Sequence, residues 1–306
     1  MKKIFGGILF FLALLEPSLI YSQTDQISDR DTLQIFQNYI STLNPNDITT
    51  LDRSANRYRQ LFEKSSSFTK DTAFIVFWRY YVTVADSLGA KYVQDEKYIS
   101  FVNIKGFDEK SSKNERLKQT LLNRNKNLNE NDFQILKKIN HYGYKFDMIE
   151  GVILVSVADP GFILNNFSGL ISHGLKLYIT KVLEEIDAAG NPEAEIHNSP
   201  DEIVNRLLWW ERFINNNPNF FLIDDCYSTY DGYLFTLMLG TVSNPAFNST
   251  DQKLNEKFKK AYEKIINHHK GTKAAAMITQ YYNILKKNNF TYSKESVKFA
   301  EQFLGE

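Results

Sequence analysis

The sequence contains a single cysteine, Cys226, so no disulfide can form within the chain. With 306 residues, the chain can bury a core large enough to fold without such a cross-link. No histidine lies near Cys226 in the sequence, and no known signature of a cysteine nucleophile surrounds it. We therefore interpret Cys226 as a buried structural thiol.

The common catalytic and metal-binding motifs are also missing. The sequence has no glycine-rich phosphate loop, no His-Glu-x-x-His, no Gly-x-Ser-x-Gly and no Cys-x-x-Cys. Its five histidines do not have the spacing of metal ligands. The sequence thus predicts neither a metal site nor a cofactor.

Neither sign of charge is in excess, because 36 Lys and Arg residues balance 36 Asp and Glu residues. Nucleic-acid binding requires concentrated basic residues. Lysines cluster only mildly, in segments 110–126 and 253–273, and acidic residues accompany them in both. We interpret both clusters as solvated helix faces and expect no nucleic-acid partner.

Only the N-terminus contains a long apolar run. A short basic start precedes the run Ile4–Leu15, and a small residue, Ser22, precedes Gln23. This layout predicts a cleavable secretory signal peptide over residues 1–22. The run is shorter than the roughly 20 apolar residues that span a bilayer. We expect a soluble, exported protein of bacterial type, periplasmic or secreted, that has no stable membrane insertion after signal cleavage.

Apolar residues at helical spacing are present in nearly every later segment. Helices are predicted over 168–188, about 225–240 and 251–268, among others, and the second of these ends at Gly240. They predict an all-α fold, a single domain over 23–306 built as an irregular bundle or array of about eleven helices. Segment 71–88 is apolar around most of its helical wheel, which predicts a central, buried helix closed by Gly89. Segment 188–200, "AAGNPEAEIHNSP", is the possible boundary if the chain forms two subdomains.

Segment 144–158 is ambiguous between helix and strand. Its β-branched residues, bounded by Gly151 and Pro160, fit a buried strand as well as a buried helix. We favour a helix, because no other strand is predicted that could pair with it. Segment 98–104 has the same ambiguity.

Three carboxylates, Glu150, Glu211 and Asp231, lie on faces that the helical wheel predicts to be apolar. Burying a lone charge is costly, so each must be paired, protonated or close to water. Such groups are candidates for acid–base catalysis. Alternatively, arginines, tyrosine hydroxyls or helix-end amides satisfy them, which makes them structural residues.

Two adjacent tryptophans lie in the helix predicted over 200–214, for which Ser199 is the expected N-cap. Trp210 shares a face with apolar residues and is predicted to be core. Trp209 lies at the edge of the polar face, where it is a candidate for stacking on a ligand ring. The alternative is that Trp209 packs under a neighbouring loop.

Two functions remain compatible with these features. The first is a non-catalytic role, in which the protein binds an unknown protein, small molecule or glycan in the periplasm or at the cell surface. The second is that of a hydrolase or lyase that cleaves a glycan with paired carboxylates in an aromatic-lined groove. Burial of the candidate acids against arginine or tyrosine favours the binding role, and an open cleft holding two of them favours the enzyme.

Overall fold

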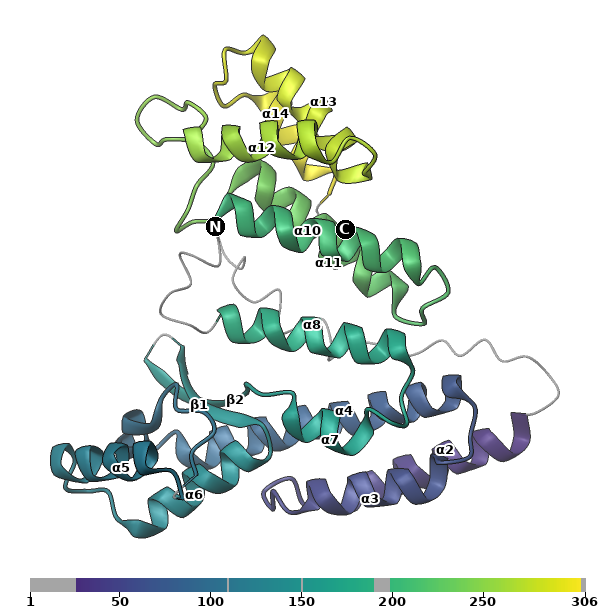
Figure 1. Ribbon diagram of the computed structural model, residues 1–306, viewed down its shortest axis with the longest axis vertical. Helices are drawn as coiled ribbons and strands as arrows, with labels where there is room; N and C mark the ends of the chain where they lie inside the picture. Colours follow the sequence, from purple (N-terminus) through teal and green to yellow (C-terminus); the bar gives the residue numbers. More distant parts are fainter. Residues whose placement is uncertain (1–25, 109, 150, 190–198, 304–306) are drawn as a thin grey trace. The chain divides into compact units, whose positions relative to one another are not determined.

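The computed structural model describes residues 26–108, 110–149, 151–189 and 199–303 (Figure 1). The predicted signal peptide, residues 1–22, lies outside the described residues. The described part contains thirteen helices and one two-stranded sheet, which confirms the all-α class. No helix within these ranges is both long enough and apolar enough to cross a bilayer.

The chain divides into two compact units, Met1–Asn191 and Pro192–Glu306. The division falls within segment 188–200, of which residues 190–198 lie outside the described part. The first unit contains α2 (Gln26–Ser41), α3 (Thr50–Phe62), α4 (Ser67–Tyr92), η1 (Glu96–Phe101), α5 (Ser112–Arg124), α6 (Glu130–His141), β1 (Tyr144–Ile149), β2 (Val152–Val157), α7 (Gly161–Phe167) and α8 (His173–Ala189). The second contains α10 (Pro200–Asn216), α11 (Ile223–Leu239), α12 (Glu256–His268), α13 (Lys273–Lys287) and α14 (Lys294–Glu301).

Helix α4 is the central helix of the first unit. Its N-cap is Ser66, whose hydroxyl accepts a hydrogen bond from the Thr69 N–H at 3.2 Å. Phe77 is fully buried, and its ring centroid lies 4.4 Å from that of Phe167 in α7. The apolar wheel of this segment therefore predicted its burial correctly.

The predicted end of this helix at Gly89 is wrong, because α4 continues to Tyr92. A side chain at Gly89 would begin 3.3 Å from the backbone nitrogen of Val155 and 3.7 Å from the Cα of Leu154, both in β2. Glycine at this position lets the strand backbone pack directly against the helix. Close packing, rather than helix termination, explains this glycine.

The predicted helix over 144–158 is also wrong. The segment forms an antiparallel hairpin in which Tyr144 pairs with Val157. The partner strand that the sequence analysis did not find is the first half of the same segment. Gly151, at a φ of 84°, supplies the left-handed conformation that tight hairpin turns need.

Aromatic packing fixes the hairpin to the helices around it. The ring of Tyr144 stacks on Tyr81 of α4 with 4.5 Å between centroids. Segment 98–104 contains the last part of the 3₁₀ helix η1, which ends at Phe101, and then one parallel bridge between Val102 and Phe146. The strand tendency seen in that segment is thus limited to a single bridge.

In the second unit, α10 and α11 have the predicted termini within about two residues. The Ser199 hydroxyl accepts a hydrogen bond from the Glu202 N–H at 3.3 Å, as expected for an N-cap. The Glu202 carboxylate accepts from Arg206 Nε at 3.3 Å. Gly240, at a φ of 78°, follows the last residue of α11.

Two other helices begin later than the sequence predicted. The helix predicted over 251–268 begins at Glu256, because Lys253 instead forms a bridge with Thr291. Asn255 is its N-cap. The helix predicted over 168–188 begins at His173, with the shorter α7 before it.

Candidate functional site

Glu211, on α10, is 8% exposed, and its carboxylate binds the N-terminus of another helix. Its carboxylate accepts hydrogen bonds from the backbone N–H groups of Lys273 at 2.6 Å and Ala274 at 2.9 Å, the first two residues of α13. Such N–H groups have no partner within their own helix, and the positive end of the helix dipole favours a carboxylate. Glu211 therefore caps α13 from a neighbouring helix.

Tyr230, on α11, is the third partner of Glu211, with its hydroxyl 3.5 Å from Oε2. Burial raises the pKa of the Tyr230 hydroxyl well above its usual range, and the charges of Glu211 and Asp231 act in the same direction. The hydroxyl thus remains a neutral donor at ordinary pH. Through these contacts Glu211 links three helices, α10, α11 and α13.

Lys273 brings Asp231 into the same group of residues. Its Nζ lies 5.5 Å from the ring centroid of Tyr230 and 5.8 Å from that of Tyr227, within cation–π range. Burial raises the pKa of the Asp231 carboxyl, and the charge of Lys273 opposes that shift. Tyr227 is 43% exposed, so this side of the group faces solvent. We call Glu211, Tyr227, Tyr230, Asp231 and Lys273 the lysine–tyrosine cluster.

Two of the three carboxylates from the sequence analysis therefore belong to one cluster. The third, Glu150, lies outside the described residues. Sequence reasoning missed Lys273, which is far from Glu211 in the chain and binds it through the backbone, so no side-chain pattern could reveal the contact. Tyr227 had a usable signal, because it precedes Asp231 by one helical turn on α11.

Trp209 is half-buried and does not belong to the cluster. Two positions separate it from Glu211, about 200° around α10. Its ring stacks on Phe213, one turn further along the same helix, with 5.4 Å between centroids and 11° between the ring planes. One face of the Trp209 ring is thus covered by the protein itself.

Two residues near the start of α11 are buried and ionisable. Cys226 is fully buried, its thiol donates to the Leu222 carbonyl at 3.2 Å, and burial raises its pKa. Asp225 is 9% exposed, and its Oδ2 has no hydrogen-bond partner among the described residues. Burial, with a smaller contribution from the charge of Asp224, raises the pKa of Asp225 to about 6. Cys226 is therefore buried, as the sequence predicted.

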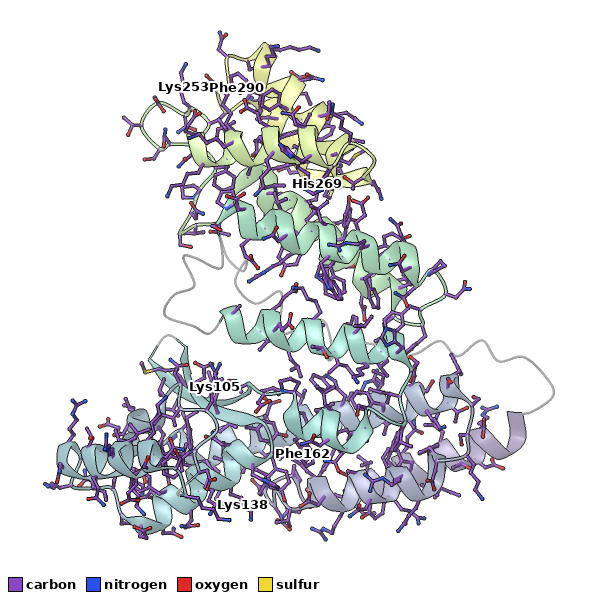
Figure 2. The ribbon with its side chains drawn as sticks, in the orientation of Figure 1. Lys105, Lys138, Phe162, Lys253, His269 and Phe290 are labelled. Atoms are coloured by element: carbon purple, nitrogen blue, oxygen red, sulfur yellow. The ribbon has the colours of Figure 1, made fainter. Side chains whose placement is uncertain are left out.

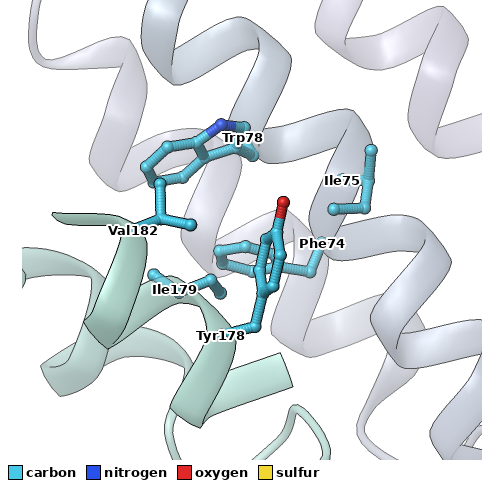
Figure 3. A pocket seen from close by; sticks show the side chains of 6 residues that line it. All are labelled: Phe74, Ile75, Trp78, Tyr178, Ile179 and Val182. Atoms are coloured by element: carbon cyan, nitrogen blue, oxygen red, sulfur yellow. The ribbon is translucent and has the colours of Figure 1, made fainter. Parts of the chain in front are cut away.

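A small apolar hollow lies in the first unit, between α4 and α8 (Figure 3). Six side chains line it: Phe74, Ile75, Trp78, Tyr178, Ile179 and Val182. Its cavity volume is about 10 Å³, room for about one water molecule, whereas typical ligand pockets measure roughly 300–1,000 Å³. The Trp78 Nε1 is buried without a hydrogen-bond partner in the described part of the chain. Because the hollow is so small, the lysine–tyrosine cluster is the better candidate site.

No family model, no curated protein and no solved structure matches this chain. Within the described ranges, no group of three His, Cys, Asp or Glu side chains is arranged to hold a metal ion. The functional interpretation therefore depends on the residues of the cluster themselves.

Proposed function

We propose that this protein is exported and binds a partner or ligand in the periplasm or at the cell surface without chemically changing it. The observation that carries the proposal is the way in which the protein itself binds the carboxylate of Glu211. Both of its oxygens accept hydrogen bonds from backbone N–H groups of α13, and the residue is 8% exposed. A carboxylate held in this way is not available to a substrate.

This observation weakens the glycan-cleaving alternative. Glycosidases of the common mechanisms use two carboxylates that flank the scissile bond. The cluster contains two of the candidate acids, Glu211 and Asp231. Among the described residues, the Asp231 carboxylate has no hydrogen bond to another part of the chain. One half-buried carboxylate can orient a ligand, but it does not supply the second group that this chemistry needs.

The exposed side of the cluster supports a binding role. Tyr227 offers part of an aromatic ring, Lys273 a cation and Asp231 an anion within the same surface. Ligand sites commonly combine an apolar contact with a few polar groups that fix orientation. Glycans and peptides both offer hydroxyl or amide groups beside apolar faces, so we propose a ligand of this mixed character.

Binding and cleavage are separated by two measurements on the same samples. Oligosaccharides of N-acetylglucosamine and of glucose are titrated calorimetrically into wild type, Tyr227→Ala and Asp231→Asn, and new reducing ends are assayed after long incubation. We expect binding without cleavage, weakened by Tyr227→Ala. New reducing ends that disappear in Asp231→Asn would contradict the binding role and favour the enzyme.

The export part of the proposal is tested separately. The basic start and the apolar run Ile4–Leu15 lead us to expect a mature N-terminus at or near Gln23. Expression of the full chain in a Gram-negative host, followed by cell fractionation and N-terminal sequencing, measures this directly. A protein that stays in the cytoplasm and begins at Met1 would refute export.

A further inference from the structure

The chain as a whole has no net charge, but its C-terminal region is strongly basic. Residues 253–298 contain eleven lysines and three glutamates, without an arginine or an aspartate, which gives a net charge of +8. The whole chain has a net charge of zero, so the rest of it must be acidic by the same amount. The basic region covers α12, α13, the turns that join the helices, and α14 as far as Lys298; α14 itself ends at an acidic residue, Glu301.

Most of these lysines are available to a partner. Ten of the eleven are exposed, and Lys259, which lies over the ring of Phe290, is half-buried. Of these eleven lysines, only Lys264 forms an ion pair with a described residue, Asp201, at 2.7 Å. The positive charge of the region is therefore not neutralised by the chain.

Backbone hydrogen bonds gather the connecting segments of these helices at one end of the second unit. The Leu254 N–H donates to the Phe290 carbonyl and the Tyr292 N–H to the Gln252 carbonyl, each at 2.8 Å. Figure 2 places Lys253 beside Phe290, and His269 at the opposite end of α12. The Asn255 N–H donates at 2.7 Å to the carbonyl of Ala246, which closes the turn after α11.

Five exposed lysines lie in these segments or in the adjoining helical turns, and we call them the lysine end: Lys253, Lys257, Lys286, Lys287 and Lys294. Three acidic residues, Asp251, Glu256 and Glu295, lie in the same segments, so the lysines remain in excess. Tyr292, in the same segments, is 46% exposed. Val242, which is 81% exposed, lies in the turn after α11, and the Asn255–Ala246 hydrogen bond joins that turn to the start of α12.

We propose that the lysine end binds peripherally to membrane surfaces that contain anionic phospholipids. Lysines near such a surface are attracted to it individually, without a defined geometry. Tyrosine is enriched at the depth of lipid headgroups, and an aliphatic side chain such as Val242 gains from contact with the acyl boundary. A sulfated polysaccharide offers the charge but no apolar phase. Nucleic-acid recognition makes frequent use of arginine, which residues 253–298 lack.

This surface is separate from the exposed side of the lysine–tyrosine cluster, and the proposal does not depend on the proposed function. The test uses the purified mature protein and vesicle flotation. Vesicles of phosphatidylcholine alone are compared with vesicles containing one-third phosphatidylglycerol. We expect binding only to the anionic vesicles, and weaker binding as salt is raised from low to physiological concentration.

Matched charge reversals locate the contact. Lys287→Glu, at the lysine end, should lower vesicle affinity at least about tenfold, since one lysine contributes about fivefold and the glutamate adds repulsion. Lys270→Glu makes the same charge change in the turn after α12. A helix of the length of α12 spans about 20 Å. Lys270 therefore lies farther from the lysine end than the electrostatic screening length of about 10 Å. Lys270→Glu should change affinity less than about twofold. Equal losses in both variants would overturn the assignment to the lysine end.

A second pair of measurements separates lipid from other polyanions. Val242→Ser should weaken binding to anionic vesicles and leave any binding to dextran sulfate or duplex DNA unchanged, because only the bilayer offers an apolar phase. All three substituted positions, Lys287, Lys270 and Val242, are exposed, so circular dichroism should show wild-type folding. Absence of binding to anionic vesicles, or binding that dextran sulfate or DNA reproduces with the same response to Val242→Ser, would overturn the proposal.

Discussion

The carboxylate of Glu211 accepts a hydrogen bond from the backbone N–H of Lys273 at 2.6 Å, so that a residue in the middle of α10 caps the start of α13. The cap side chain of α13 itself, Thr272, binds the Ala275 N–H at 3.0 Å. Together the two side chains satisfy the first three N–H groups of the helix. This arrangement accounts for a carboxylate on an otherwise apolar face.

The cap makes Glu211 important for stability. Glu211→Ala leaves two N–H groups of α13 without acceptors, each worth about 1–3 kcal/mol when buried, and should lower the free energy of unfolding by about 2–4 kcal/mol. Glu211→Gln retains one acceptor oxygen and should cost less. Urea denaturation followed by circular dichroism measures both. Glu295→Ala, an exposed change in the same unit, serves as the control and should stay within about 0.5 kcal/mol. Unchanged midpoints for both Glu211 variants would refute the capping role.

Gly89 should tolerate no branched side chain. Gly89→Val would force β2 away from α4, because the first added carbon already lies 3.3 Å from the Val155 nitrogen. We expect a loss of about 1–3 kcal/mol, the usual range for overpacking. Gly232→Ala is the control: Gly232 lies within α11 with nothing within 4 Å of an added Cβ. It should stabilise the protein by about 0.5–1 kcal/mol through helix propensity. A Gly89→Val variant as stable as wild type would show that the hairpin does not pack as described.

Cys226 should react slowly with thiol reagents in the folded protein. Burial raises its pKa, so the thiolate fraction is very small at pH 8, and the fully buried sulfur is not accessible. Reaction with a chromogenic disulfide reagent should be slow without denaturant and complete within minutes in strong denaturant. Since Cys226 is the one cysteine of the chain, the signal has a single source. Fast reaction without denaturant would contradict its burial.

Asp225 should make stability decrease as pH rises. Its pKa is raised from 3.8 to about 6, so between these values the folded protein keeps a proton that the unfolded chain has lost. Asp225 does not affect the free energy of unfolding below about pH 4. Its destabilising effect grows between about pH 4 and pH 6 and is complete above that range. Two pKa units correspond to about 2–3 kcal/mol.

Asp225→Asn should remove this dependence. The variant should resemble wild type near pH 4 and exceed it in unfolding free energy at pH 7. Asp251→Asn, at an exposed position, should give no such pH-dependent difference. Denaturation of the three proteins at several pH values is the measurement, and parallel curves for wild type and Asp225→Asn would contradict the prediction.

Local chemistry let the sequence determine the helices and many of their ends. Apolar residues one turn apart meet on the same helix whatever surrounds it, so the helical class and the burial of α4 could be predicted. The same holds for the N-cap Ser199 and for Gly240 after α11, whose partners lie within a few residues. The helical wheel also placed Glu211 on an apolar face, where it is buried.

Only the tertiary structure decided which distant groups these residues meet. The β-branched segment 144–158 became a hairpin because its two halves pair and pack on α4, and periodicity cannot distinguish a short buried strand from a helix. Gly89 is explained by a strand more than sixty residues later, and Glu211 by the backbone of Lys273 at a similar separation. A pattern of side chains in the sequence does not show which distant backbone groups folding brings together. For this reason the sequence could identify these residues but not their partners.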